Sequence, residues 1–283
     1  MPAVPVSLLE PIWHQFAALL PDRPVVSPTH PLGCHRRRIP DRVVFEHVVD
    51  ALVHGSGYER IAGGACSDRT IRRRVRDWAE AGVMQRLHAL VVEQYDRMIG
   101  LDLDDVAVDG CITKAPGGGE KAGRSPVDRG KQGLKRSALT DGTGIPLHVV
   151  SAGANRHDAS LLAPTMAGLE ALVGPLPHGI AAHLDRGYDS AATRTLLAGL
   201  AITEAIARKG TPAPLQAGKR WVVERTQSWM NGYGKLRRCT ERNGLVVDCY
   251  LFLAAAFVVT RCLIRRARTR YRWATRPTTR RLK

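Results

Sequence analysis

Apolar residues in the first hundred positions recur with the spacing of α-helices. In RVVFEHVVDALVHG, which begins at residue 42, Val44, Val48 and Leu52 fall on one helical face, and Asp41 is expected to cap that helix. A further helix is predicted over residues 84–99. The pattern predicts a small all-α region, preceded by a Pro-rich segment.

A second helix, within SDRTIRRRVRDWAEAGV (67–83), is amphipathic and strongly basic. Ile71, Val75 and Trp78 are spaced by four and three residues and face inward, and Ser67 or Asp68 can cap the helix. The rest of its surface is expected to carry Arg69, Arg72, Arg73, Arg74 and Arg76. A short helix, a turn and an arginine-rich helix are typical of a helix-turn-helix, although an ordinary solvated basic helix has the same pattern.

Near residue 103 the pattern changes to short apolar strands that alternate with helices. LDDVAVDGCI (103–112) predicts a strand with Asp109 at its exit, and GIAAHLDRGYDS (179–190) predicts a buried strand that ends at Asp185. The remaining predicted elements are a hairpin over 136–153, helices over 158–173, 191–200 and 219–238, and a strand over 203–210. A Gly-rich basic loop over 113–133 separates the first strand from the hairpin. Such alternation predicts an α/β domain with a mixed sheet.

The charge of the chain points to a polyanion as its partner. The 283 residues carry a formal net charge of +16, with a pI near 10.2. Residues 261–283 hold ten Arg and Lys and no acid. Clustered positive charge of this size favours contact with the phosphates of nucleic acid.

Several other classes are disfavoured. The six cysteines show neither CxxC pairs nor zinc-finger spacing with histidine, so we expect reduced thiols rather than disulfides or a metal site. The N-terminus has early prolines and no basic stretch, which argues against a signal peptide. The most apolar run, residues 249–259, is too short to cross a bilayer and suits a buried helix.

The basic segment RWVVERTQSWMNGYGKLRRCTER (220–242) raises a question because it keeps one early carboxylate, Glu224. The helical period predicts a core face of Val222, Thr226, Trp229, Tyr233 and Leu236. The opposite face would carry Arg220, Glu224, Gln227, Asn231, Lys235 and Arg238. A surface pair between Arg220 and Glu224, worth about 0.3–0.5 kcal/mol, would explain the acid without any function.

Two further acids suggest a different role for Glu224. Asp109 and Asp185 each follow a predicted apolar strand, and ligands are met at strand ends in α/β sheets. With Glu224 they could hold two Mg²⁺ ions about 3.5–4 Å apart, since hard cations prefer carboxylate oxygens. Spacing alone favours ordinary turn or cap roles for the two aspartates.

Several motifs together resemble a known family. VAVDG, DRGKQGLKRSALTDGTGIPLHVVSAGANRHD, HLDRGYDS and RWVVERTQSWMNGYGKLRRCTER look like the DDE transposases of the bacterial insertion-sequence-five group, over about residues 40–270. The resemblance implies an RNase H-like fold and makes Asp109, Asp185 and Glu224 the catalytic, metal-binding triad. The family has an Arg four positions before this glutamate, and Arg220 matches it. The family often has a Lys seven positions after the glutamate, but position 231 of this chain is Asn. That basic role would then fall to Lys235.

The resemblance also implies the function and the partners. We expect a transposase that binds the terminal inverted repeats of its element, cleaves DNA with two Mg²⁺ or Mn²⁺ ions, and joins the 3′-OH end to target DNA. An RNase H-like nuclease without strand transfer and a non-catalytic DNA-binding regulator are the alternatives. His157 and Asp158 of the NRHD motif are kept out of the catalytic set, as a packing residue and a helix N-cap.

These expectations define the organisation of the chain. The Pro-rich segment would cover residues 1–40, a helical DNA-binding domain 41–100, the RNase H-like domain 101–268 and a basic tail 269–283. The expected DNA-binding residues are Arg69, Arg72, Arg73, Arg76, Arg220 and Lys235. We expect a homodimer or higher oligomer on double-stranded DNA, in the bacterial cytoplasm at the nucleoid and not in a membrane.

Overall fold

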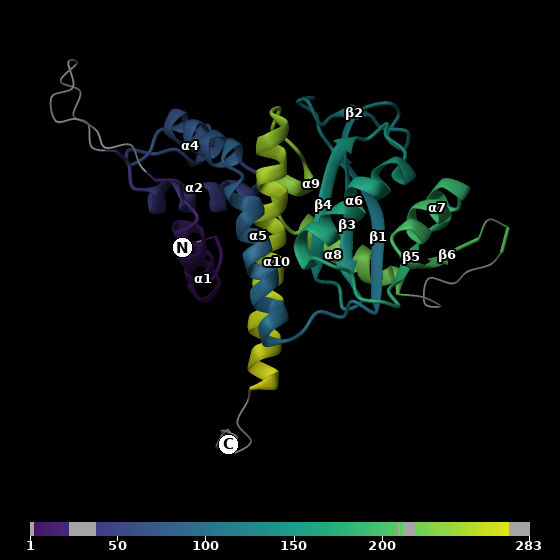
Figure 1. The fold of residues 1–283 in the computed structure, drawn as a ribbon. Coiled ribbons are helices and arrows are strands. Elements are labelled where there is room, and N and C mark those ends of the chain that lie inside the picture. Colours follow the sequence, from purple (N-terminus) through teal and green to yellow (C-terminus); the bar gives the residue numbers. More distant parts are fainter. Residues whose placement is uncertain (1–2, 23–37, 209, 212–218, 272–283) are drawn as a thin grey trace, which may run out of the picture.

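The computed structural model describes residues 3–22, 38–208, 210–211 and 219–271. Its elements are α1 (Val6–Ala18), α2 (Asp41–His54), α3 (Tyr58–Ile61), α4 (Asp68–Glu80), α5 (Val83–Met98), β1 (Asp105–Lys114), β2 (Gly123–Arg124), β3 (Gln132–Asp141), β4 (Pro146–Gly153), α6 (Asp158–Val173), β5 (Ala181–Leu184), η1 (Arg186–Tyr188), α7 (Ala191–Gly199), β6 (Thr203–Ile206), α8 (Arg220–Asn231), α9 (Gly234–Arg237) and α10 (Gly244–Arg270). The chain thus begins with helices and continues as alternating strands and helices (Figure 1).

The N-terminal helices pack on one another and on α10 through apolar side chains that are part of the same core as those of the sheet. The Ser67 hydroxyl caps α4 by accepting from the Thr70 N–H, and Ile71, Val75 and Trp78 are buried, as predicted. One expectation for this region is wrong: Asp41 is not a cap but a buried partner of Arg74. The Pro-rich segment before residue 41 also contains α1, whose Phe16 packs on Trp78.

Five strands form a mixed sheet in the spatial order β4–β3–β1–β5–β6, and the short β2 extends the β4 side of β3. The strands β1, β3 and β4 are antiparallel neighbours, whereas β5 and β6 run parallel to β1. This order and these directions are the RNase H-like arrangement that the resemblance implies. The predicted fold class is confirmed.

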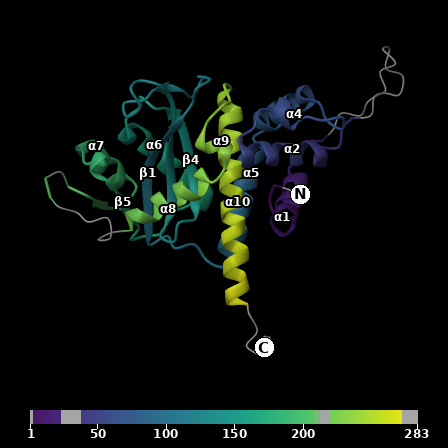
Figure 2. The same ribbon diagram turned by 180° about the vertical axis from the view of Figure 1, so that it is seen from behind.

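The two faces of the sheet are covered by different helices (Figures 1 and 2). On one face α6 packs over β3 and β4, with the Thr165 hydroxyl donating to the Ser137 hydroxyl at 2.8 Å. On the other face α8 packs over β1, where the Asn231 amide nitrogen lies 3.8 Å from the Cys111 sulfur. Because side chains alternate along a strand, Asp109 shares the α8 face with Cys111, two residues away.

The last helix, α10, lies between the N-terminal helices and the sheet (Figures 1 and 2). It packs along α5 on one side and against β4 on the other, where Asp248 accepts from the Ser151 hydroxyl. Its 27 residues extend well beyond the predicted apolar run and include the beginning of the predicted tail, to residue 270. By length and composition alone it could span a membrane, but 78% of its most apolar window is buried inside the protein. That burial is what a core helix shows.

Other boundaries also differ from the prediction. The strand β1 continues five residues past Asp109, because Lys114 still pairs with Gly133 of β3. The predicted helix over 219–238 is two helices, α8 and α9. The interruption lies where Gly234 meets the chain at Gly55: a Cβ on Gly234 would approach the Gly55 nitrogen to 2.5 Å.

Part of the prediction falls outside the described residues. This holds for Cys34, for residues 1–2 and 23–37 of the Pro-rich segment and for residues 272–283 of the basic tail. Among the described cysteines none forms a disulfide.

His88 of α5 makes the junction between helices and sheet sensitive to acid. Its side chain is buried, with Nε2 2.8 Å from the Pro146 carbonyl oxygen, and burial lowers its pKa to about 4. The unfolded chain therefore binds an extra proton as the pH falls from about 6.5 towards 4. We expect this proton uptake at His88 to lower the free energy of unfolding by about 3 kcal/mol across that pH interval. Denaturant unfolding of His88→Gln should show a smaller loss between pH 7 and pH 4.5 than the wild type, and equal losses would contradict the assignment.

Candidate active site

Asp109 lies in the middle of β1 rather than at its exit, which corrects the prediction. Its Oδ1 accepts from the Gly110 N–H at 2.8 Å, and its carbonyl oxygen accepts from the Gln227 amide of α8 at 3.4 Å. The Gln227 bond thus links the backbone at Asp109 to the helix that carries Glu224.

Asp185 directly follows β5, as predicted, and the strand register brings it level with Asp109. The parallel pairing matches Asp105 with Ala181 and Ala107 with His183. Continuing by two residues on both strands places Asp185 opposite Asp109. Asp185 is exposed, and its Oδ1 accepts from the Gly187 N–H at 2.8 Å.

Glu224 is exposed on α8, one turn before Gln227, the residue that contacts the Asp109 carbonyl. Asp109, Asp185 and Glu224 are far apart in the sequence and come from a strand, a strand end and a helix. The fold gathers them at one place on the α8 face of the sheet.

The charges of these residues act on one another. Burial raises the pKa of Asp109 to about 7; the Gly110 hydrogen bond opposes the rise, and the negative charges of Asp185, Glu224 and Asp158 add to it. A raised pKa at this position therefore reports both partial desolvation and closely spaced carboxylates.

The donor set suits a hard divalent cation. Asp109, Asp185 and Glu224 offer only carboxylate oxygens, and a bound cation would offset the repulsion between carboxylates that contributes to the raised pKa of Asp109. Within the described ranges, no three His, Cys, Asp or Glu side chains already converge into a metal-binding group. Ligation by this triad stays a prediction.

Residues 100–258 match the family described as "Transposase DDE domain", and residues 8–88 match a second described as "Putative transposase of IS4/5 family". The chain belongs to the DDE transposase family. It is also 34% identical over 146 residues to the "Putative transposase for insertion sequence element IS402" of Burkholderia cepacia, covering 50% of this chain and 69% of that protein.

Further similarities are weaker. The "Insertion element IS402 uncharacterized 16.2 kDa protein" of Burkholderia cepacia is 29% identical over 117 residues, which is 41% of this transposase and 78% of the relative. A pre-cleavage Mos1 transpososome structure aligns over 93% of this chain and 88% of that one, with 11% identity and a TM-score of 0.29. A Mos1 strand transfer complex aligns over 92% and 88%, with 12% identity and a TM-score of 0.31. These scores are too low to support inferences about geometry.

Behind Asp109, on the opposite face of the sheet, the transposase holds a half-buried ion pair that the sequence did not reveal. Asp158 accepts from the Lys135 ammonium at 2.9 Å, and its Oδ1 fills the space where Gly110 has no side chain: a Cβ there would meet it at 1.9 Å. The predicted roles of the two NRHD residues are wrong. The exposed His157 is the N-cap of α6, accepting from the Ala159 N–H at 3.3 Å, and Asp158 is the first helical residue.

The basic residues predicted around Glu224 differ in their placement. Arg220 is the first residue of α8, one turn before Glu224. Lys235 is buried, forms an ion pair with Glu241, and lies over the rings of Tyr58 and Tyr250 at 4.9 and 5.4 Å. A side chain enclosed in this way cannot hold DNA, so the DNA-binding role of Lys235 is wrong.

The arginines of α4 divide into a buried and an exposed group. Arg74, predicted on the surface, is buried and paired with Asp41. Arg72 is exposed but pairs with Glu59 and Asp68. The side chains of Arg69, Arg73 and Arg76 are exposed. The layout α3, turn, α4 is as predicted, and the exposed arginines leave its basic face open to solvent.

Proposed function

We propose that this transposase binds the terminal inverted repeats of an insertion sequence, hydrolyses a phosphodiester there, and transfers the resulting 3′-OH end to target DNA. The observation that carries the proposal is the gathering of Asp109, Asp185 and Glu224 on one face of the RNase H-like sheet. The basic charge of +16 supports DNA as the substrate.

Transposases of this family use divalent metal, and we infer two Mg²⁺ or Mn²⁺ ions bound by these three carboxylates. Bound metal would activate the attacking oxygen and stabilise the leaving oxygen. The Gly110 and Gly187 N–H groups each fix one carboxylate oxygen of Asp109 and Asp185, and so orient the pair before substrate arrives. We infer that Arg220, one turn from Glu224, contacts the scissile phosphate.

For recognition of the ends we propose the exposed face of α4, with Arg69, Arg73 and Arg76, while Arg72 contributes only by exchanging its carboxylate partners for phosphate. The division into a DNA-binding unit (41–100) and a catalytic unit (101–268) stays a prediction, and α10 packs against both. We infer action as a homodimer or higher oligomer on DNA at the bacterial nucleoid.

The proposed reaction is tested with purified protein and a duplex that carries the inverted repeats flanking its gene. Cleavage is expected with Mg²⁺ or Mn²⁺ and should stop when EDTA removes them, because the site offers only carboxylate donors. Undiminished cleavage in chelator would exclude metal catalysis.

Strand transfer separates the proposal from its alternatives. Pre-cleaved ends with a 3′-OH should join to a supercoiled plasmid, whereas 3′-dideoxy ends should not. Metal-dependent cleavage without joining would indicate a nuclease. Binding of the repeats without metal-dependent nicking would indicate a regulator.

A further inference from the structure

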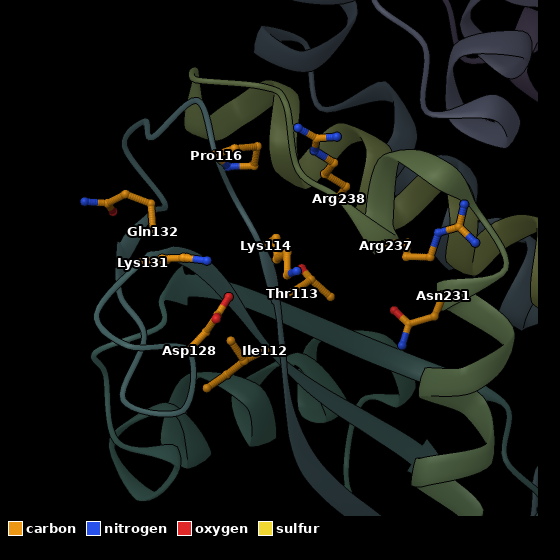
Figure 3. A pocket seen from close by; sticks show the side chains of 10 residues that line it. All are labelled: Ile112, Thr113, Lys114, Pro116, Asp128, Lys131, Gln132, Asn231, Arg237 and Arg238. Carbon is orange, nitrogen blue, oxygen red and sulfur yellow. The ribbon is translucent and has the colours of Figure 1, made fainter.

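A cavity of about 1020 Å³ lies beyond Asp109 along β1 (Figure 3). Three segments form its walls: the end of β1 and the turn after it, the loop that leads into β3, and the α8–α9 region. Its lining residues are Ile112, Thr113, Lys114, Pro116, Asp128, Lys131, Gln132, Asn231, Arg237 and Arg238. The cavity therefore shares both β1 and α8 with the candidate active site.

The lining is strongly positive. Lys114, Lys131, Arg237 and Arg238 face a single carboxylate, Asp128. The side chains of these four cations are exposed, and across the described chain none has an ion-pair or hydrogen-bond partner. Four cations grouped in this way repel one another, and the repulsion is relieved when an anion binds.

A buried guanidinium, which lies behind Asn231, adds to the positive charge around the cavity. The fully buried Arg136 donates to the Asn231 Oδ1 at 2.5 Å and lies 3.2 Å from the Cys111 sulfur, while its Nε and Nη1 have no partner in the described chain. A buried cation without a carboxylate is costly to keep. Asn231, which lines the cavity (Figure 3), accepts the bond from Arg136 through its oxygen, while its amide nitrogen lies 3.8 Å from the Cys111 sulfur.

The position of the cavity matches the spacing of a DNA strand. Asn231 is seven residues after Glu224, or about 10 Å along α8, and Ile112 is three residues after Asp109, also about 10 Å along β1. Neighbouring phosphates of one strand lie farther apart than their axial rise of about 3.4 Å, because each nucleotide also rotates about the axis of the duplex. A strand with one phosphate at the carboxylates would thus place a phosphate about one or two nucleotides away in the cavity.

We propose that this cavity binds the phosphodiester backbone of a DNA strand about one or two nucleotides from the bond at the carboxylates, through Lys114, Lys131, Arg237 and Arg238. The proposal deepens the proposed function and rests on it for the distance from the cut. Contact with the DNA backbone itself needs no cleavage, so the two can be tested separately.

The test measures the affinity of the full chain for a fluorescein-labelled 30-base-pair duplex of mixed sequence, in EDTA, over a series of salt concentrations. Loss of two phosphate contacts in Lys114→Ala/Lys131→Ala should weaken binding about 10- to 100-fold at low salt. It should also flatten the slope of log K against log salt by about two. A wild-type slope would overturn the proposal.

Two matched variants exclude simpler explanations. Arg86→Ala/Arg97→Ala removes the same charge from exposed positions on α5 and should leave the slope nearly unchanged; a loss equal to that of the cavity variant would overturn the proposal. Asp128→Asn removes the only acid of the lining and should tighten binding about threefold, a gain that misfolding cannot produce. Unchanged or weaker binding by Asp128→Asn counts against the cavity.

Cleavage assayed in parallel with Mg²⁺ keeps the two proposals distinct. If the wild type cuts no DNA while the salt slopes change as expected, the cavity binds DNA and the proposed function fails. If the wild type cuts and the cavity variant keeps the wild-type slope, the proposed function stands and the cavity proposal fails.

Discussion

Asp109→Asn, Asp185→Asn and Glu224→Gln are each expected to lower DNA cleavage at least roughly 10³-fold while leaving affinity for the element ends nearly unchanged. Each change removes a negatively charged oxygen that a divalent cation requires, and keeps the size of the side chain. Single-turnover cleavage on saturating, pre-bound ends measures the chemical step separately from binding. Near wild-type cutting by any one variant would remove that residue from the triad.

Melting curves in EDTA control for misfolding in this experiment. Asp109→Asn should not lower the melting temperature at pH 8, because it removes a partly buried charge whose folded-state pKa is raised to about 7. Because the pKa of Asp109 is raised in the folded wild-type protein, the free energy of unfolding falls as the pH rises from about 4 through 7. A variant that melts earlier than the wild type at pH 8 would show that Asp109 has a structural role instead.

Arg74→Met is expected to destabilise the protein by about 3–5 kcal/mol, the usual consequence of removing one member of a buried ion pair. Arg74 and Asp41 join α4 to α2 with both side chains buried, so the change leaves the Asp41 carboxylate enclosed with less positive charge around it. Urea unfolding followed by circular dichroism measures the loss. Arg38, 3.6 Å from Asp41 and half exposed, is too accessible to compensate fully.

The adjacent residue provides the matched control. Arg73→Met removes the same charge from the exposed face of α4 and should change stability by less than about 0.5 kcal/mol. It should instead weaken DNA binding, with a flatter salt dependence. Equal unfolding free energies for the two variants would contradict the buried pair, and unchanged DNA binding by Arg73→Met would move recognition away from α4.

The sequence predicted those features that depend on local pattern. Period and cap residues located α4, the hairpin of β3 and β4, and the strand that ends before Asp185, because amphipathic spacing and turn residues act over a few positions. The triad was found by resemblance, since no spacing links a strand residue at 109 to a helix residue at 224. Once the motif is known, the strand register explains why Asp109 and Asp185 lie level.

The errors arose where distant contacts decide the outcome. The strand β1 passes Asp109 because β3 continues to pair with it as far as Lys114. The helix at Glu224 ends early because Gly234 meets Gly55, and Lys235 is buried because Glu241 and two tyrosines enclose it. The Lys114, Lys131, Arg237 and Arg238 cluster was missed for the same reason: its members come from three separate segments.

The placement of α10 has a consequence for synthesis of the protein. The apolar face of α5 is covered by residues near the C-terminal end of the chain, where Arg266 also donates to the Tyr95 hydroxyl. A nascent chain therefore carries α5 uncovered until about 170 further residues have left the ribosome, and the region proposed to recognise DNA can complete its packing only then. A fragment cut short before residue 244 would lack this cover, so we expect shortened products to be cleared by proteases rather than to occupy the element ends in competition with the full-length enzyme.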